Sequence, residues 1–402
     1  MFRLRDTRYP NTASFLSSAI EIAEYYGFTS LSEKAKSPEP VEHEEKRRIP
    51  STADCEEKML FARRDERGLV ASARKCASRA HPGETLLLWR IAPSAKEKPN
   101  IPVMSLELHV VGTSEAIAEA VLIIVAHTIA EEAGITQRIL SINSIGSPDS
   151  SNRYVRDVGT YLRKHIESIS PSLHSRIPTD PLGTLVQLIE RGHPATPRAP
   201  QSMEYLTEEE RKKFWNLLEY LERFGLPYEL NPHILGSRDC WAHSLYEIST
   251  VDPETGGRVT LAAGGRYDPL ASLFAPGISS AMISITCEIR GKTALRRPER
   301  GVPSIFFAHL GSEARRRGLA VLETLRRNEI FVHHGLCFGS IGEQMAIVRR
   351  LAFPYVLIMG HKEAMEDTIL VRETATNSQE AIPLPELVQY LRRHRIAASA
   401  VA

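Results

Sequence analysis

The apolar positions near the start of the chain predict an amphipathic helix. They recur at the spacing of one helical face, at Phe15, Ala19, Ile22, Ala23 and Tyr26. Asn11 or Thr12 can cap the helix, and Gly27 can end it. A stripe of this kind suits the core of the chain, and it would also suit a dimer interface.

Further along, alternating and continuous apolar runs predict a mixture of strands and helices. Residues 85–91 and 105–111 read as the two strands of a hairpin. Further strands are expected at 139–145, 228–230, 244–250 and 259–262, and helices at 60–78, 114–133, 151–169 and 207–224. The last helix has a capping box at Thr207 and a stop at Gly225. The apolar stretch 278–289 could be a strand or a buried helix.

The character of the chain changes after residues 296–302, which form a basic linker bounded by proline. Strands are expected at 304–310, 330–333, 354–360 and 368–371, and helices at 313–327, 341–351 and 384–393. This alternation predicts a small α/β domain with a largely parallel sheet.

Composition narrows the class of protein only modestly. The 402 residues allow two or three domains, and 42% hydrophobic and 25% charged residues are typical of a globular protein. A net charge of +1 gives no global attraction to nucleic acid. The five cysteines are scattered, so we expect reduced thiols, no metal site and a cytoplasmic location. The longest apolar stretch, 116–130, is interrupted by charge and is too short to cross a membrane.

The densest chemistry lies in the run Gly-Gly-Arg-Tyr-Asp at 264–268. The paired glycines allow a backbone or a ligand to approach a strand closely. Arg266 offers a rigid fork of donors for a carboxylate or phosphate, and Asp268 can orient it. The run therefore predicts either a pocket wall with Arg266 and Tyr267 or a strand end with an ion pair.

This run resembles the second histidine-specific motif of histidyl-tRNA synthetases and of their paralogue, the regulatory subunit of ATP phosphoribosyltransferase. Other stretches resemble family landmarks in the same order: Tyr-Tyr-Gly-Phe at 25–28 the dimerising first motif, Leu-Trp-Arg-Ile at 88–91 the second, and 303–393 the anticodon-binding domain. The resemblance implies an α+β class II core with an antiparallel sheet and flanking helices over 1–295, with an irregular insertion at 171–225. It also implies a linker at 296–302 and an α/β anticodon-binding-like domain over 303–402.

The residues that would carry out the chemistry depart from the family pattern. Arg90 stands at the position of the ATP-phosphate arginine, but Ala92 replaces the acidic residue after it, and the following loop has only lysines. Ser105 and His109 replace the glutamine and glutamate that would hold histidine. Glu66 could match the carboxylate for the amino group of the substrate, or it could be a solvated helix-start charge.

Two further arginines of the family are missing from their expected positions. Gly236 stands where the first histidine-specific motif has its catalytic arginine, although Asp239 and Trp241 of that motif remain, and Arg238 could partly substitute. Thr286 stands where the third motif has the arginine that clamps the triphosphate, and Arg290 follows four residues later. We therefore assign no catalytic residue.

Three functions remain open from the sequence. The first is an impaired or inactive synthetase paralogue, acting as a homodimer that binds tRNA or a synthetase-like protein partner. The second is a diverged but active histidine–tRNA ligase using ATP and Mg²⁺. The third is a histidine-sensing regulatory subunit, which the C-terminal domain disfavours. For the arginines of that domain the sequence allows solvated helix faces or a tRNA contact, at Arg315, Arg316, Arg317, Arg326, Arg327, Arg349 and Arg350.

Overall fold

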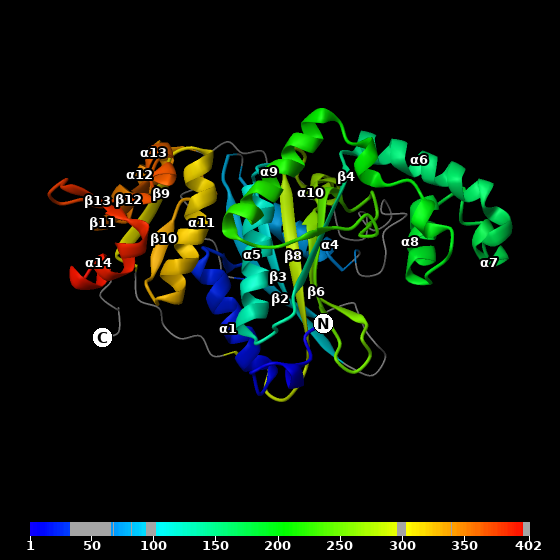
Figure 1. Cartoon of the computed structure of the whole chain (residues 1–402), viewed down its shortest axis with the longest axis horizontal. Coiled ribbons are helices and arrows are strands. Elements are labelled where there is room, and N and C mark those ends of the chain that lie inside the picture. Colours follow the sequence, from blue (N-terminus) through cyan, green and yellow to red (C-terminus); the bar gives the residue numbers. More distant parts are fainter. Residues whose placement is uncertain are drawn as a thin grey trace.

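A computed structural model describes residues 1–32, 66, 68–81, 83–93, 102–295, 303–338 and 340–396. The lysine-bearing loop at 94–100 and the linker at 296–302 lie outside these ranges. Within the described residues, a large sheet and a small sheet lie side by side with helices around them (Figure 1).

The large sheet confirms the predicted class II-like core. Its eight strands have the order β1-β2-β3-β8-β7-β6-β4-β5, antiparallel except for the parallel pairs that β1 and β5 make at the edges. The apolar stretch 278–289, left open by the sequence, forms a strand between two others. The bounds are β1 (Thr29–Ser30), β2 (Leu86–Pro93), β3 (Val103–Val111), β4 (Ile139–Gly146), β5 (Glu229–Leu230), β6 (Ala242–Val251), β7 (Arg258–Arg266) and β8 (Ser280–Glu288).

Two long helices cover one face of this sheet. Helix α1 (Thr12–Tyr25) is capped by Asn11, whose side chain accepts from Ser14 N at 2.9 Å. Its apolar stripe is buried within the single chain, so the core reading of this helix is confirmed, and the stripe is not left open for a second subunit. Helix α5 (Ile117–Glu132) is apolar on nearly all sides because it is enclosed by the sheet, α1 and α9.

The opposite face of the sheet carries shorter helices and the predicted insertion. Helices α4 (Val70–Ala77) and α10 (Asp268–Phe274) pack together there. Helix α6 (Pro148–Lys164) and the first two helices of the insertion, α7 (Pro171–His174) and α8 (Pro181–Glu190), lie at one end of the molecule (Figure 1). Helix α9 (Glu208–Phe224) follows, with the predicted capping box at Thr207 and a left-handed Gly225 at its end.

The C-terminal domain has its own five-stranded sheet, in the order β10-β9-β11-β12-β13. Strands β10, β9 and β11 are parallel, and the last two are antiparallel. The edge strand β13 was not predicted because four of its five side chains are exposed and only that of Ile382 is buried. The bounds are β9 (Ile305–His309), β10 (Val332–His334), β11 (Tyr355–Met359), β12 (Thr368–Glu373), β13 (Gln379–Pro383), α11 (Ser312–Arg327), α12 (Ile341–Arg350), α13 (His361–Met365) and α14 (Leu387–Arg393).

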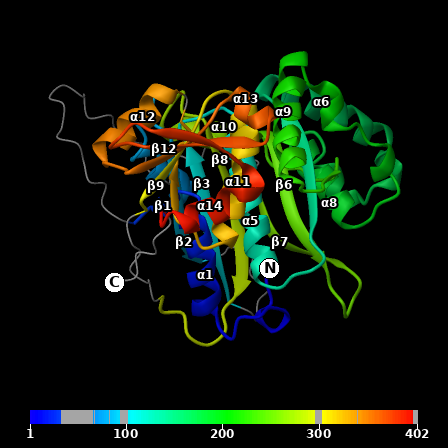
Figure 2. The same cartoon turned by 60° about the vertical axis from the view of Figure 1, so that its left-hand side comes forward.

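Helix α11 joins the C-terminal domain to the rest of the chain, and we call this contact the domain seam. It lies beside α1, α5 and α9 (Figure 2), and one apolar core runs through both parts. Glu323 is buried at its centre and accepts from Tyr26 Oη at 2.8 Å and from the guanidinium groups of Arg326 and Arg327. Tyr25 Oη donates across the seam to the carbonyl of Ile330 at 2.9 Å.

Four of the arginines considered for tRNA contact are committed to carboxylates of the first domain. Each forms an ion pair across the seam: Arg315 with Glu115, Arg316 with Glu219, Arg326 with Glu132 and Arg327 with Glu131. These pairs make the arginine-rich side of α11 an internal contact.

Candidate functional site

The candidate site begins as one row of residues across the large sheet. Register partners on neighbouring strands point to the same face, because facing residues in a sheet share a side. The row starts on β4 and ends on β2, and it reads Ser141, Glu247, Ala263, Ser284, Glu107, Arg90. All but Arg90 line a cavity of about 470 Å³ on the face opposite α5.

The walls of this cavity come from segments that are far apart in the sequence. Helix α8 contributes Glu190, and the stretch before β6 contributes residues 231 and 233–236 together with Trp241. Glu66 closes the wall near β3. Small or hydroxylated residues of the sheet form the floor, among them Ser105, Thr260, Gly264 and Thr286. A site of this size can hold a small molecule.

Glu66 is buried, and it holds the wall around the position of the missing arginine. Its Oε1 accepts from the backbone N–H of Ser237 at 2.8 Å and from the indole N–H of Trp241 at 3.0 Å. The solvated-charge reading of Glu66 is therefore wrong, since the residue lines the cavity with its carboxylate bound inside the protein.

Gly236 occupies a place that no other residue could fill without rearrangement. A β-carbon at this position would overlap Cδ1 of Trp241, whose ring packs directly on the glycine. The indole therefore takes the space into which a side chain at 236 would extend.

Arg90 belongs to a network beside the cavity. One of its terminal nitrogens donates to Ser72 Oγ and lies 3.9 Å from Glu107 Oε2. Burial raises the pKa of Glu107, but its contacts with His109 and Ser72 and the charge of Arg90 outweigh burial and bring the pKa below its usual value.

His109 and Tyr267 lie behind this network, under α4. They are fully buried and do not line the cavity; His109 Nδ1 lies 3.1 Å from Tyr267 Oη, and His109 Nε2 lies 3.5 Å from Glu107 Oε2. Burial lowers the pKa of His109, but contacts with Cys76 and Glu107 raise it to about 10. His109 therefore lies between Tyr267 and Glu107 in the protein interior.

Arg266 projects to the opposite face of the sheet, away from the cavity. Its guanidinium pairs with Glu119 of α5 at 2.6 Å and donates to the carbonyl of Thr113 at 3.1 Å. Arg266 thus forms an ion pair that is buried and not at the surface, and it also lines a separate cavity of about 410 Å³ on this face, whereas Tyr267 does not line that cavity. Gly264 and Gly265 are needed because β-carbons there would overlap the backbones of β8 and β6.

The other predicted residues divide between the cavity and its surroundings. Ser105 lines the cavity, and its hydroxyl donates to the carbonyl of Ala92 at 3.2 Å. Asp239 lies outside the cavity lining, where its backbone N–H donates to Ser237 Oγ.

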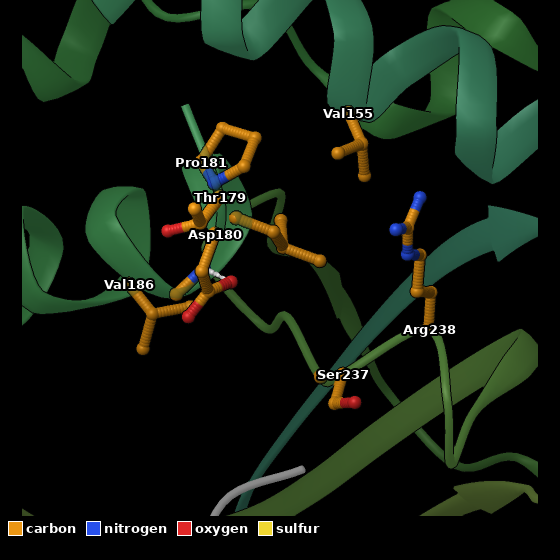
Figure 3. Close-up of a pocket in the computed structure, with 10 residues that line it drawn as sticks. Val155, Thr179, Asp180, Pro181, Val186, Ser237 and Arg238 are labelled. Carbon is orange, nitrogen blue, oxygen red and sulfur yellow. Dashed lines mark hydrogen bonds between the residues drawn. The ribbon is translucent and has the colours of Figure 1, made fainter. Parts of the chain in front are cut away.

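The two arginines that could have replaced the missing ones do not line this cavity. Arg238 donates to Asn152 on α6 at 3.0 Å and borders a separate small cleft, where it lies across from Asp180 (Figure 3). Arg290 is exposed beyond the end of β8, where its backbone bonds to Thr12.

Among the described residues, the charges that line the cavity do not fit a nucleotide triphosphate. Of the described residues that line it, Arg258 is the single arginine or lysine, and Glu229 holds it at 2.6 Å at the mouth. Phosphate binding needs several such donors. The lining instead carries four carboxylates, those of Glu66, Glu107, Glu190 and Glu247.

Three of these carboxylates, those of Glu107, Glu190 and Glu247, were not identified from the sequence. Glu107 lies between Ser105 and His109 on the same face of a predicted strand, so the alternation that selected its neighbours could have selected it too. Glu247 carried no such signal. Among the described residues, no cluster of three or more histidine, cysteine or acidic side chains could hold a metal ion.

Comparisons with known proteins agree with the architecture. A family model described as an anticodon binding domain matches residues 305–394. The histidine–tRNA ligase of Symbiobacterium thermophilum is 28% identical over 296 residues, which cover 72% of this chain and 68% of that protein. The histidine–tRNA ligase of Caldanaerobacter subterraneus is 25% identical over 393 residues, covering 91% of this chain and 92% of that protein.

A solved structure supports the fold. The apo histidyl-tRNA synthetase of S. aureus aligns with a TM-score of 0.50 at 20% identity, covering 94% of both chains. The relatives, the core sheet and the anticodon-binding match agree: the chain is similar to histidyl-tRNA synthetases along most of its length.

Proposed function

We propose that this protein is a synthetase-like binding or regulatory protein that does not activate histidine at an ordinary rate. The observation that carries the proposal is the Gly236–Trp241 contact, in which an indole fills the space of the catalytic arginine. Two further observations support it: Arg258 is already paired with Glu229, and Arg238 and Arg290 do not line the cavity. No described residue of the cavity therefore offers a free guanidinium to a phosphate.

The expected size of the defect follows from transition-state electrostatics. Removing one preorganised donor from a developing charge costs about 100-fold to 1,000-fold in rate. Loss of two arginines then predicts activation slower by about 10⁴-fold or more, if the losses are independent.

Exchange of labelled pyrophosphate into ATP in the presence of histidine tests this proposal. The similar ligase of Bacillus subtilis is the matched positive control. We expect exchange near the background of a reaction without histidine. Exchange within about 100-fold of the control would contradict the proposal and establish the second function, a diverged histidine–tRNA ligase with ATP and Mg²⁺, which the curated relatives favour.

Binding of tRNA is a separate part of the proposal. The anticodon-binding match supports it, but the seam removes four arginines from the available surface. A contact would rely on exposed cations such as Arg349, Arg350, Arg392 and Arg393. Gel shifts with tRNA across salt concentrations should show a shallow salt slope if few phosphates are contacted, and absence of any shift would exclude this part.

Partner and location complete the proposal. We infer a homodimer because the first motif resembles the dimerising motif of the family, although the apolar face of α1 is covered by the same chain. The molar mass measured by light scattering decides between one and two chains. A protein partner would be a synthetase-like chain. A reducing, cytoplasmic setting is supported by Cys76, Cys287 and Cys337, which are free thiols. No described helix has the length and apolarity to cross a membrane.

The histidine-sensor function is tested by a thermal shift with free histidine.

A further inference from the structure

Two carboxylates face one another across the cavity floor. Glu107 on β3 and Glu247 on β6 belong to the same row, and Ser284 and Ala263 are the two residues between them. Three steps of about 4.8 Å between neighbouring strands place their α-carbons about 14 Å apart. Because serine and alanine rise little above the sheet, the space between the two acids is open.

Glu107 presents part of its carboxylate to this space. Its residue exposure is 5%, and its contacts with described residues, those with Ser72, His109 and Arg90, all involve Oε2. No described residue donates a hydrogen bond to Oε1, and Glu107 lines the cavity. A carboxylate oxygen at a cavity wall, with no donor among the described residues, is available to accept from a ligand or from solvent.

The other residues that line the cavity add further negative charge. Glu247 Oε1 accepts a hydrogen bond from Thr260 Oγ1 at 2.9 Å, which orients it without changing its charge. Glu66 adds a third carboxylate, and Trp241 adds an aromatic surface of the kind that attracts cations. Arg258 cannot offset these charges fully, because Glu229 already pairs with it.

We propose that the cavity binds a small organic dication without a carboxylate or phosphate, of the class of short aliphatic diamines. One ammonium group would meet Glu107 Oε1 and the other Glu247, with the carbon chain lying over Ala263 and Ser284. A carboxylate on the same ligand would instead stand near Glu66 and Glu247, where like charge disfavours it. The inference rests on the proposed function in one respect, namely that nucleotide does not occupy the cavity.

Isothermal titration calorimetry of the full chain with two probes of similar length tests this inference. The probes are 1,4-diaminobutane and 4-aminobutanoate, which differ in having an ammonium or a carboxylate at one end. We expect the diamine to bind at least about 10-fold more tightly, because a charge-assisted hydrogen bond is replaced by repulsion. Glu107→Gln and Glu247→Gln should each weaken the diamine by about 10-fold or more.

Glu190→Gln is the matched control, since Glu190 is an exposed residue at the rim of the same cavity. It should change the affinity by less than about 2-fold. Equal binding of the two probes, no heat at millimolar diamine, or an unchanged affinity in both Glu107→Gln and Glu247→Gln would each overturn the inference.

The experiment separates a loss of folding from a loss of diamine binding, and it separates diamine binding from the proposed function. Near-ultraviolet circular dichroism reports whether Glu107→Gln has disturbed the network around His109, and Glu247→Gln tests the opposite wall independently. Failure of diamine binding leaves a negative pyrophosphate exchange unaffected, whereas rapid exchange would contradict the proposed function even if a diamine bound.

Discussion

The cavity and the domain seam use charge in opposite ways. Around the cavity, the described lining residues include four carboxylates and one arginine that is already paired. At the seam, four arginines of α11 each meet a carboxylate of the first domain, and Glu323 joins two of them from within. Guanidinium groups thus hold the domains together and do not serve the cavity.

The difference indicates which parts of an inherited scaffold remain under structural constraint. A buried ion pair must keep both partners, because removing one leaves an uncompensated charge. The residues that line a cavity need not be retained in this way once the ligand has changed. The seam should therefore tolerate substitution poorly, and the cavity should tolerate it well in stability while changing what it binds.

The largest expected effect is at the centre of the seam. Glu323→Gln removes the charge that pairs with Arg326 and Arg327, and we expect a loss of about 3 kcal/mol in the free energy of unfolding. Urea denaturation followed by circular dichroism measures it. Glu366→Gln, at an exposed position in the same domain, is the control and should change stability by less than about 0.5 kcal/mol. Equal effects of the two substitutions would mean that the seam is not held by charge.

Acid should erase most of the difference between the native protein and Glu323→Gln. Burial raises the pKa of Glu323, but Arg326, Arg327 and Tyr26 outweigh it, so the pKa lies below its ordinary value of 4.5. The stabilisation is then fully present above pH 4.5 and is lost as pH falls through the folded pKa. Unfolding measured between pH 7 and pH 3 should show the two proteins converging, and a constant difference would contradict the ion-pair account.

A smaller effect is expected when the missing arginine is restored to the cavity. Gly236→Arg forces a side chain against Trp241, and we expect a loss of about 2 kcal/mol without a gain in pyrophosphate exchange. Adding Trp241→Tyr, which replaces the indole with a smaller aromatic ring, should recover part of the stability. The double mutant would then be more stable than the sum of the single effects predicts. Additive effects would show that the indole does not block this position.

The smallest effect concerns the mouth of the cavity. Arg258→Gln breaks an exposed pair with Glu229 and should change stability by less than about 1 kcal/mol. It leaves an unpaired carboxylate at the entrance, so the affinity for 1,4-diaminobutane should rise about 2-fold at low salt. The gain should vanish at high salt, and an affinity that fell instead would argue against a cation as the ligand.

Much of the fold could be predicted because its strands and helices follow regular apolar spacing. The hairpin of β2 and β3, the helix capped at Thr207 and the alternating C-terminal domain all lie within a few residues of their predicted bounds. The edge strand β13 was missed because most of its side chains are exposed, so its sequence shows no alternation of apolar and polar residues. The sequence could not distinguish a strand from a helix at residues 278–289, because a segment that is buried on both faces lacks a periodic apolar pattern.

The site was predicted less well, and Arg266 shows why. Alternation along β7 puts Arg266 on the face opposite to Ala263, but the sequence alone does not say which of the two faces carries the cavity. A usable signal lay elsewhere: Glu119 interrupts an apolar helix, and a buried carboxylate requires a cation. The partners of the α11 arginines could not be predicted, since Glu131, Glu132 and Glu219 lie about 100 to 200 residues away in sequence.

The single core shared by α1, α5 and α11 sets an order of events during protein synthesis. Helices α1 and α5 leave the ribosome early, whereas α11 begins at residue 312 and is made near the end. Until then, the apolar surface that α11 will cover has no partner in the nascent chain, and such surfaces recruit chaperones or aggregate. Truncation before residue 312 should therefore yield an insoluble product and not a smaller working protein.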